Sequence, residues 1–396
     1  MFASVQVNLS HNKLRSLPDR LMNELPELRA VDLSHNQLES VKPGLWQNSS
    51  QLQRINLGYN RLRSLPERLL VGLTRVHLNL EHNRLSGLPP RLVDRTKVHA
   101  LHSIDLSHNF FDQMPVDALQ KQFFFLDYLN LANNRIRSIP SDSNVLVTIK
   151  TLDLSFNPLA QESIDDILSE PKKVKDLNLA GTGISRLRVL ETPFLRSLNL
   201  SLNRIERLDG DVFQRPLLLE VLDVSSNHIS SIEPSVWSQV VHLKKLVLSA
   251  NPLRRIDAGH LDGLTSLEQL DAERLTQCVA VEAAAFAQLP GLRSLRLSGL
   301  PRLESLPVRH ILQLLTTLEV VDIELTEPAL QDQLAPAFRP RLRELHVHGR
   351  GIREPTYPFT LSVLPLTQRK RTLAVYLLDL PAHTVAFDAH VCVQIW

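Results

Sequence analysis

Four histidines recur at one position of a repeated phrase, and imidazole nitrogens are common ligands of transition metals. They are His11, His35, His82 and His108, and Tyr59 holds the same position between the second and the third. Each of the five stands directly before an asparagine, so the five share one turn on neighbouring strands. A histidine is also an ordinary surface residue at this place in such a phrase. We therefore expect surface residues here and no metal site.

The sequence motifs of nucleotide, metal and hydrolytic sites do not occur in the chain. There is no Gly-x-x-x-x-Gly-Lys loop, no His-Glu-x-x-His helix, no Cys-x-x-Cys pair and no Gly-x-Ser-x-Gly elbow. The sequence predicts no catalytic residue, no cofactor and no enzymatic activity.

The asparagines that follow the histidines form the strongest pattern in the chain. They recur in steps of 23 to 26 residues, apart from one step of 46 residues in which Thr182 holds the position. An asparagine side chain offers two donor hydrogens and an acceptor, so a column of them can satisfy backbone groups inside an apolar stack. A threonine offers one hydroxyl and should make a weaker rung. We call this column the asparagine ladder: Asn12, Asn36, Asn60, Asn83, Asn109, Asn134, Asn157, Thr182, Asn203, Asn227 and Asn251.

Each rung belongs to the same leucine phrase, as in Leu28-x-x-Val31-x-Leu33-x-x-Asn36-x-Leu38. Alternation in the central part predicts a short strand with one apolar face. The phrase and its period resemble the leucine-rich repeat. That resemblance implies an α/β-type repeat solenoid, a curved horseshoe with one parallel sheet on the concave face and irregular or short helical returns on the convex face. Bulky residues should fill the convex side: Trp46, Phe213, Trp237, Leu261 and Phe286.

Regularity changes along the chain, although composition does not. We predict about 11 regular repeats over residues 1–257, and degenerate repeats over 258–396 that continue the same solenoid to an uncapped C-terminus. Beyond Asn251 no asparagine occurs, but the leucine phrase continues. Its later copies are Leu267-x-x-Leu270-x-Ala272, Leu292-x-x-Leu295-x-Leu297, Leu318-x-x-Val321-x-Ile323, Leu342-x-x-Leu345-x-Val347 and Leu373-x-x-Tyr376-x-Leu378.

A polar strip should run along the concave face, one residue per strand. It consists of Asp32, Asn56, Asn79, Asp105, Asn130, Asp153, Asn178 and Asp223. Neighbouring strands lie roughly 4.8 Å apart, so the strip is continuous and could recognise a partner. Short polar residues also suit this crowded position in any such protein, and that alternative stays open.

Three Asn-x-Ser sequons could accept glycans, at Asn8, Asn48 and Asn199. Their number is close to the chance expectation. Asn48 is the best candidate because it lies in a return segment and not on a strand.

Charge argues against a nucleic-acid partner, because 44 basic and 42 acidic residues are mixed along the chain. The cluster Arg369-Lys370-Arg371 is expected in a solvated loop. No apolar run reaches the roughly 18 residues of a membrane helix. Membrane association would therefore depend on an anchor that is not visible in this chain.

Both ends of the chain look cut. Met1 leads directly into a repeat without a signal peptide, and only two cysteines, Cys278 and Cys392, are present. Solenoids need caps over their terminal repeats. We therefore expect a fragment of a longer protein.

Within the repeat family, the chain resembles chaoptin-like cell-surface adhesion proteins. The resemblance is sharpest from Leu303-Glu304-Ser305-Leu306-Pro307 to Arg341-Leu342-Arg343-Glu344-Leu345. It implies a photoreceptor-type membrane glycoprotein, held on the extracellular face by a GPI anchor and joining cells by binding another copy of itself. The partner would be a protein.

Two alternatives remain. The chain could be a Toll-like pattern-recognition ectodomain, although cysteine caps, a membrane helix and a signalling domain are not visible. It could also be an intracellular scaffold that binds a signalling protein on its concave face, although such scaffolds usually keep a strict period of about 23 residues.

Overall fold

The computed structural model describes most of the chain. The described residues are 5–18, 21–22, 25–93, 101–119, 122, 125–140, 148–169, 173–213, 218–234, 236–325, 342–349, 374–378 and 392–395. The cluster at Arg369–Arg371 and the chain start at Met1 lie outside them. The chain divides into two compact units: unit 1 is Met1–Ile184 with Glu191–Leu198, and unit 2 is Ser185–Leu190 with Asn199–Trp396.

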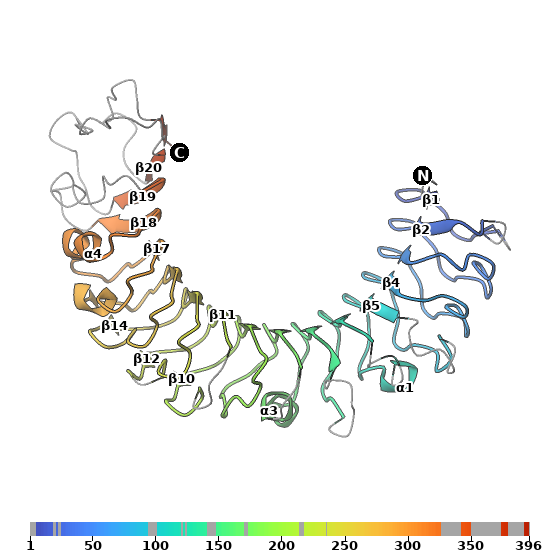
Figure 1. Ribbon diagram of the computed structural model, residues 1–396, viewed down its shortest axis with the longest axis horizontal. Helices are drawn as coiled ribbons and strands as arrows, with labels where there is room; N and C mark the ends of the chain where they lie inside the picture. Colours follow the sequence, from blue (N-terminus) through green and yellow to red (C-terminus); the bar gives the residue numbers. More distant parts are fainter. Residues whose placement is uncertain are drawn as a thin grey trace. The chain divides into compact units, whose positions relative to one another are not determined.

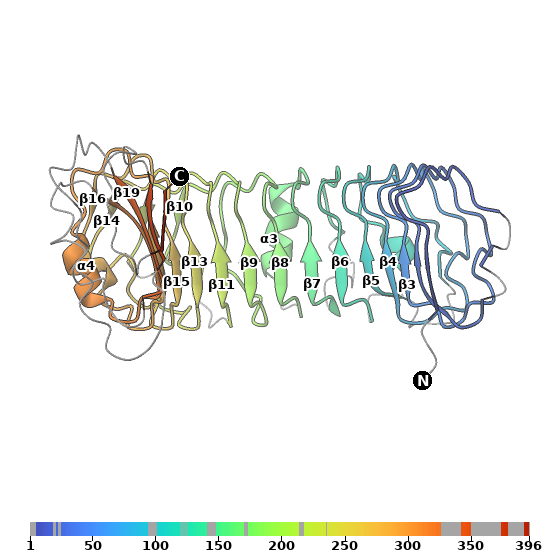
Figure 2. The same ribbon diagram turned by 90° about the horizontal axis from the view of Figure 1, so that it is seen from above.

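Unit 1 is a stack of coils, each of which contributes one short strand to a parallel sheet. Figure 2 shows β3 to β8 side by side and pointing in the same direction. The strands are β1 (Val5–Asn8), β2 (Leu28–Asp32), β3 (Arg54–Asn56), β4 (Val76–Asn79), β5 (Leu101–Asp105), β6 (Tyr128–Asn130), β7 (Thr151–Asp153) and β8 (Asp176–Asn178). The strand β9 (Ser197–Asn199) lies where the sequences of the two units meet.

The register of this sheet follows the leucine phrase. Ile55 pairs with Leu78, Leu78 with Ile104, and Ile104 with Leu129. All four are buried, while the residues on either side of each are more exposed. Side chains in a strand alternate between its two faces, so every coil turns the same apolar positions inward. The core of unit 1 is therefore a stack of leucine layers.

Unit 2 repeats this arrangement. Its main strands are β11 (Val221–Asp223), β13 (Lys245–Val247), β15 (Gln269–Asp271), β17 (Ser294–Leu297), β18 (Val320–Leu325), β19 (Glu344–Gly349), β20 (Ala374–Leu378) and β21 (Cys392–Ile395). Two small parallel pairs join return segments: β10 (Arg207–Leu208) with β12 (Ser231–Ile232), and β14 (Arg255–Ile256) with β16 (Ala280–Val281).

One predicted register is wrong. The phrase Leu373-x-x-Tyr376-x-Leu378 would align Tyr376 with Leu345, but in the sheet Tyr376 pairs with His346 and Val375 pairs with Leu345. A shift of one residue exchanges the two faces of a strand. No asparagine follows this strand to mark the turn, and several apolar residues in succession fit either register.

Among the described residues the returns are mostly irregular and include short helical segments. These are α1 (Val116–Leu119), α3 (Gln161–Ser169), the 3-10 helix η1 (Ala283–Phe286) and α4 (Val308–Leu314). In Figure 1 α3 lies on the side of its unit opposite to the strands. Its buried residues, among them Ile164, Ile167 and Leu168, recur at the spacing of one helix face.

The predicted convex residues do fill the return side. Trp46 and Trp237 are fully buried, and so are Phe213, Leu261 and Phe286. Each indole nitrogen donates to a carbonyl of the following coil: Trp46 to Leu69 O at 2.7 Å, and Trp237 to His260 O at 2.8 Å. The spine thus joins coils by hydrogen bonds as well as by packing.

The predicted fold class is confirmed: the chain is a solenoid of parallel strands with short or irregular returns. Within the described ranges, no helix is long and apolar enough to cross a bilayer.

Candidate functional site

The open face of the sheet in unit 1 carries two columns of outward side chains. One is the polar strip predicted from the sequence, whose members pair in register from strand to strand, as Asp32 with Asn56 and Asn79 with Asp105. The other, which we call the outer column, stands two residues earlier on each strand. Its members are Ala30, Arg54, His77, Ser103, Tyr128, Thr151 and Asp176.

Every member of the polar strip stabilises the turn that follows its strand. Its side-chain Oδ1 accepts a hydrogen bond of 2.8–3.1 Å from the backbone N–H two residues later. This bond is the Asx turn that short polar side chains favour. The acceptor–donor pairs are Asp32–Ser34, Asn56–Gly58, Asn79–Glu81, Asp105–Ser107, Asn130–Ala132, Asp153–Ser155, Asn178–Ala180 and, in unit 2, Asp223–Ser225.

Some members of the strip also bind each other across strands. Asn130 Nδ2 donates to Asp105 Oδ2 at 2.9 Å, and Asn178 Nδ2 donates to Asp153 Oδ2 at 2.8 Å. The strip is therefore rigid before any partner arrives, which lowers the entropic cost of binding to it. Its local bonds also give a structural reason for short polar residues at this position.

A hollow of ≈ 320 Å³ opens on this face across strands β3 to β6. It brings three members of the polar strip together with four residues of the outer column that sequence reasoning did not single out. In the sequence these four residues can be recognised only by their position two residues before each member of the strip. The residue type at that position varies from strand to strand, so no pattern is visible. The lining residues with outward side chains are Arg54, Asn56, His77, Asn79, Ser103, Asp105 and Tyr128.

Burial sets the protonation of the hollow. Desolvation, then the neighbouring His102 and Arg54, lowers the pKa of His77 below its ordinary 6.5. His77 Nδ1 lies 2.8 Å from Ser103 Oγ, and its ring meets the ring of His102 edge-on at 5.1 Å. At neutral pH this imidazole is therefore uncharged.

Tyr128 supplies the aromatic surface of the hollow. Burial, then the charge of Asp105, raises the pKa of its phenol, so the hydroxyl stays protonated at neutral pH. With the guanidinium of Arg54, the carboxylate of Asp105 and the neutral imidazole of His77, the hollow offers one cation, one anion and two aromatic rings. Such a set can hold a polar or charged side chain of another protein, because aromatic and arginine residues dominate protein interfaces.

The asparagine ladder lies on the other side of the turn, inside the stack. Asn109 shows the pattern: its Nδ2 donates to Leu106 O and Ser107 O of its own coil and to Leu80 O of the preceding coil at 3.0 Å. Its Oδ1 accepts from Leu85 N at 2.9 Å. One amide thus satisfies four backbone groups on two coils. The rungs that reach the preceding coil in the same way are Asn36, Asn60, Asn83, Asn109, Asn134, Asn157, Asn227 and Asn251.

The remaining rungs also bond carbonyl groups of their own coils. Asn12 is exposed and bonds Leu9 O and Ser10 O of its own coil. Thr182 donates to Leu179 O at 2.8 Å. Asn203 donates to Leu200 O and Ser201 O.

The residues before the rungs form a column of left-handed backbone. His11, His35, Tyr59, His82 and His108 have φ values of 50° to 56°. Their rings stack face to face, with centroids 3.9–4.3 Å apart. In the part of the chain that is described, no three His, Cys, Asp or Glu side chains are placed to hold a metal.

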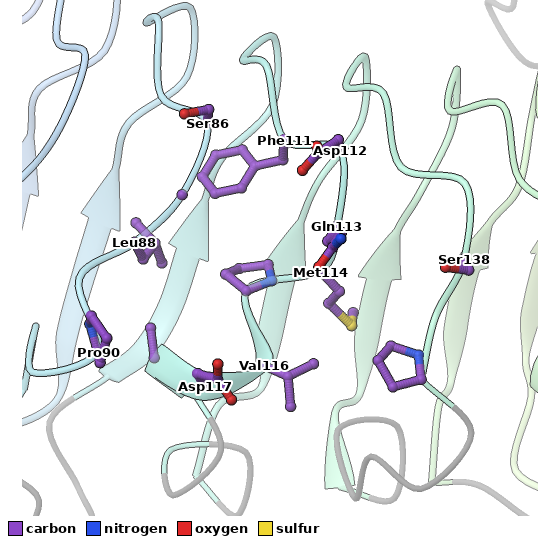
Figure 3. A pocket seen from close by; sticks show the side chains of 14 residues that line it. Ser86, Leu88, Pro90, Phe111, Asp112, Gln113, Met114, Val116, Asp117 and Ser138 are labelled. Carbon is purple, nitrogen blue, oxygen red and sulfur yellow. The ribbon is translucent and has the colours of Figure 1, made fainter.

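A second depression lies on the return side of unit 1. Figure 3 shows it among successive coils, with Ser86 and Leu88 on one coil and Ser138 on another. It holds ≈ 370 Å³ and is lined largely by proline and apolar side chains, among them Met114 and Val116. Polar side chains also line it, among them Asp112, Gln113 and Asp117.

The candidate glycan acceptors differ in setting. Asn48 is exposed in a turn of a return segment, beside the buried Ser49, whose hydroxyl donates to Met22 O at 2.8 Å. Asn8 and Asn199 lie on strands and accept the Asx bond from Ser10 and Ser201.

Cys278 is a free, buried thiol, and burial raises its pKa. Its Sγ lies 3.4 Å from Ala280 O. The side chain of Cys392 lies outside the described residues.

Comparison with known proteins agrees with the repeat. The family model described as leucine rich repeat matches residues 26–85, 193–253 and 218–277. Tsukushi of Rattus norvegicus is 27% identical over 211 residues, which are 52% of this chain and 52% of Tsukushi. Chaoptin of Drosophila melanogaster is 27% identical over 258 residues, which are 58% of this chain and 19% of chaoptin. The matches thus span about half of Tsukushi and about a fifth of chaoptin.

Solved structures share the fold. An internalin from Listeria monocytogenes superposes with a TM-score of 0.57 at 17% identity, covering 80% of this chain and 86% of the internalin. A chain of the Drosophila Toll–Spatzle complex superposes with a TM-score of 0.53 at 22% identity, covering 94% of this chain and 46% of that one.

The leucine phrase recurs in both units, and the family model matches coils in each of them. This chain therefore belongs to the leucine-rich-repeat proteins and, among them, resembles chaoptin.

Proposed function

We propose that this chain is the recognition part of a cell-surface adhesion protein and that it binds another copy of itself. The single observation that carries the proposal is the open sheet face of unit 1, where the hollow with Arg54, Asp105 and Tyr128 lies on a rigid polar strip. Leucine-rich-repeat proteins are generally binding proteins, and the resemblance to chaoptin supports adhesion among their functions.

The charges of this face suit a contact between like surfaces. Arg29 and Arg54 are exposed near the start of their strands, whereas Asp32, Asp105 and Glu81 lie further along. A contact with two-fold symmetry places each patch of one copy against the complementary patch of the other. The basic patch of each copy then faces the acidic patch of the other, so the attractive contact occurs twice.

Tethering would make a weak contact effective. A rigid array held on one membrane meets its copies on the opposite membrane at high local concentration, so many weak contacts add up. We propose that a GPI anchor supplied by the rest of the protein provides this tether, as the resemblance implies, and that Asn48 carries a glycan on the extracellular side.

The test is the clumping of beads that carry the full chain in one orientation. Wild-type beads should clump, and Arg54→Glu beads should clump far less, because the reversed charge faces the acidic patch of the partner. Glu81→Arg beads should fail in the same way. A mixture of the two variants should clump again, since each supplies the charge that the other now requires.

The controls separate adhesion from other binding. Lys173→Glu with Lys175→Glu changes the charge on exposed positions away from the hollow and should leave clumping intact. Wild-type beads that stay single would overturn homophilic adhesion. If such beads capture a soluble protein through Arg54, a receptor that binds a protein ligand takes its place, as the Toll–Spatzle complex illustrates for Toll.

The scaffold alternative makes a different prediction. A scaffold would bind an intracellular signalling protein on the same face, and an unglycosylated chain would retain that binding. Secretion of the full-length protein with a glycan at Asn48 would contradict it.

A further inference from the structure

The segments that follow the ladder asparagines bring separate basic residues onto one edge of unit 1. Backbone bonds hold these segments in a constant register, as Arg61 N to Leu38 O at 2.9 Å and Arg84 N to Leu62 O at 2.8 Å. The second residue after each asparagine is turned inward: Leu38, Leu62 and their equivalents are buried. The first and the third residues therefore point outward in every coil.

These two outward positions are strongly basic. Over six coils they hold seven basic and two acidic residues. Every one of the seven is exposed, and none forms an ion pair with another described residue. The basic residues are Lys13, Arg15, Arg61, Arg63, Arg84, Arg135 and Arg137, and the acidic ones are Glu39 and Asp112. We call this surface the basic edge.

The stacked ring column borders the basic edge, because each ring precedes a ladder asparagine and each basic position follows it. His11, His35, Tyr59 and His108 are exposed, and His82 is half-buried. Stacking covers both faces of the inner rings, from His35 to His82. Their edges remain, and a ring edge offers N–H or O–H groups rather than a flat surface for stacking.

Coil spacing arranges these groups along a line. Neighbouring coils lie roughly 4.8 Å apart, so Lys13 and Arg61, two coils apart, are separated by roughly 10 Å along the stack. A line of fixed cations beside a line of imidazole donors matches a linear polymer with regularly spaced anions. A compact anion would use only one or two of these groups.

We propose that the basic edge binds a linear sulfated polysaccharide, lying along the coils from Lys13 to Arg137. Arginine and lysine side chains neutralise the sulfates, and release of the polymer's counterions drives the association, as it does for other polyanions. Single-stranded nucleic acid fits less well, because its bases bind by stacking on free aromatic faces, and the inner rings have none.

Acid should strengthen this binding, because protonation of His82 adds a cation beside the edge. The charged groups around the best-enclosed ring, His82, are His108 and His35, which oppose its protonation, and Glu81 and Asp105, which favour it. Occupation by a sulfated chain reverses this balance, since its anions favour the charged ring.

The test measures the affinity of the full chain for a size-defined heparin fragment at several salt concentrations. Arg61→Glu with Arg84→Glu should weaken binding at least tenfold near physiological salt and lower the slope of log Kd against log salt by about 2, one for each lost contact. Lys173→Glu with Lys175→Glu makes the same change of charge elsewhere in unit 1 and should change the affinity less than twofold. Circular dichroism checks that both variants stay folded.

Each outcome decides the proposal. An equal loss in both pairs of variants means attraction by overall charge and overturns a defined edge. Failure of the wild type to bind heparin also overturns it. Equal affinity for a DNA duplex of matched charge overturns the choice of polysaccharide. The result is independent of adhesion, because Arg61 and Arg84 lie outside the hollow, so their variant should still clump on beads.

Discussion

Two stretches of this solenoid build the same turn with opposite chemistry. Up to Asn251 the position after the left-handed residue is nearly always an asparagine that bonds two coils. In the next two coils the same position is Leu275 and then Leu300, both with 0% exposure. The left-handed residue persists before them, as Arg274 with φ 56° and Gly299 with φ 71°.

The comparison shows that the backbone conformation of the turn does not depend on the asparagine that hydrogen-bonds its polar groups. Backbone bonds between coils survive the change, as Ala250 N to Glu273 O at 2.8 Å and Arg274 N to Ser298 O at 2.7 Å. The left-handed residue and these bonds therefore define the turn. The asparagine adds hydrogen bonds to groups inside the turn, whereas the leucine adds apolar packing.

The largest effect should come from the leucine version of the turn. Leu275→Ala removes a fully buried side chain and should destabilise the protein by about 2–5 kcal/mol through lost burial and a cavity. Urea unfolding measures the loss. Leu275→Met keeps the volume and should cost below about 1.5 kcal/mol. A small loss for alanine would mean that the turn does not depend on this packing.

The asparagine version should be somewhat less sensitive. Asn109→Ala leaves Leu85 N–H and Leu80 O without their side-chain partner and should cost about 1–3 kcal/mol. Asn12→Ala is the matched control, because Asn12 is exposed and bonds only its own coil. We expect a change within about 0.5 kcal/mol there. Equal losses at the two positions would remove the argument for bonds between coils.

The shared part of the turn should be sensitive to substitution in both stretches. Gly181 and Gly299 hold the left-handed position with φ of 64° and 71°. Alanine at either site should cost at least about 1 kcal/mol, because left-handed backbone disfavours a Cβ. The loss should be larger at Gly181, where the new Cβ would lie 2.7 Å from Phe156 Cδ1. Gly87→Ala is the control, since Gly87 has open space around its Cβ position and no positive φ. Thermal unfolding that shows a loss at one site alone would contradict a common turn.

The smallest effect should be a difference in pH dependence. Burial, then His108, lowers the pKa of His82 in the folded state, so protons favour the unfolded chain. The histidine contribution is complete above pH 6.5 and declines as the pH falls below it. Burial, then Asp322, raises the pKa of Glu273 from 4.5, so its contribution is lost as the pH rises through the raised value.

Urea unfolding between pH 4 and pH 7 measures these opposite slopes. His82→Asn suits the left-handed backbone and should flatten the decline below pH 6.5. Glu273→Gln should remove the loss of stability that accompanies rising pH and leave the pH dependence that comes from His82. If a variant keeps the wild-type pH dependence of the free energy of unfolding, the side chain that was replaced does not contribute to that dependence.

The sequence predicts the ladder stretch well because two signals coincide there. The leucines mark the inward face, and the asparagine marks the turn, so registers such as Ile55 with Leu78 follow directly. Past Asn251 the second signal is missing, and the register at Tyr376 was wrong by one residue. Leu275 and Leu300 carry the turn in a form that an asparagine pattern does not detect.

The surfaces could be predicted only in part. The polar strip consists only of aspartate and asparagine, so it is visible in the sequence, but its Asx bonds depend on the turn geometry. Arg54, His77 and Tyr128 differ in type, and only the pairing of strands brings them into one hollow. The basic edge is hidden in the same way, because acidic residues between its members in the sequence balance the overall charge.

The buried indoles give the protein two built-in optical probes. Trp46 belongs to unit 1 and Trp237 to unit 2, and each indole is held by a carbonyl of the neighbouring coil. Separation of adjacent coils would expose the indole to water and shift its emission to longer wavelength. The chain has a third tryptophan, Trp396. Replacing Trp396 and one of the two buried indoles by phenylalanine would leave a single probe, so that the melting of each unit could be followed by fluorescence without any added label.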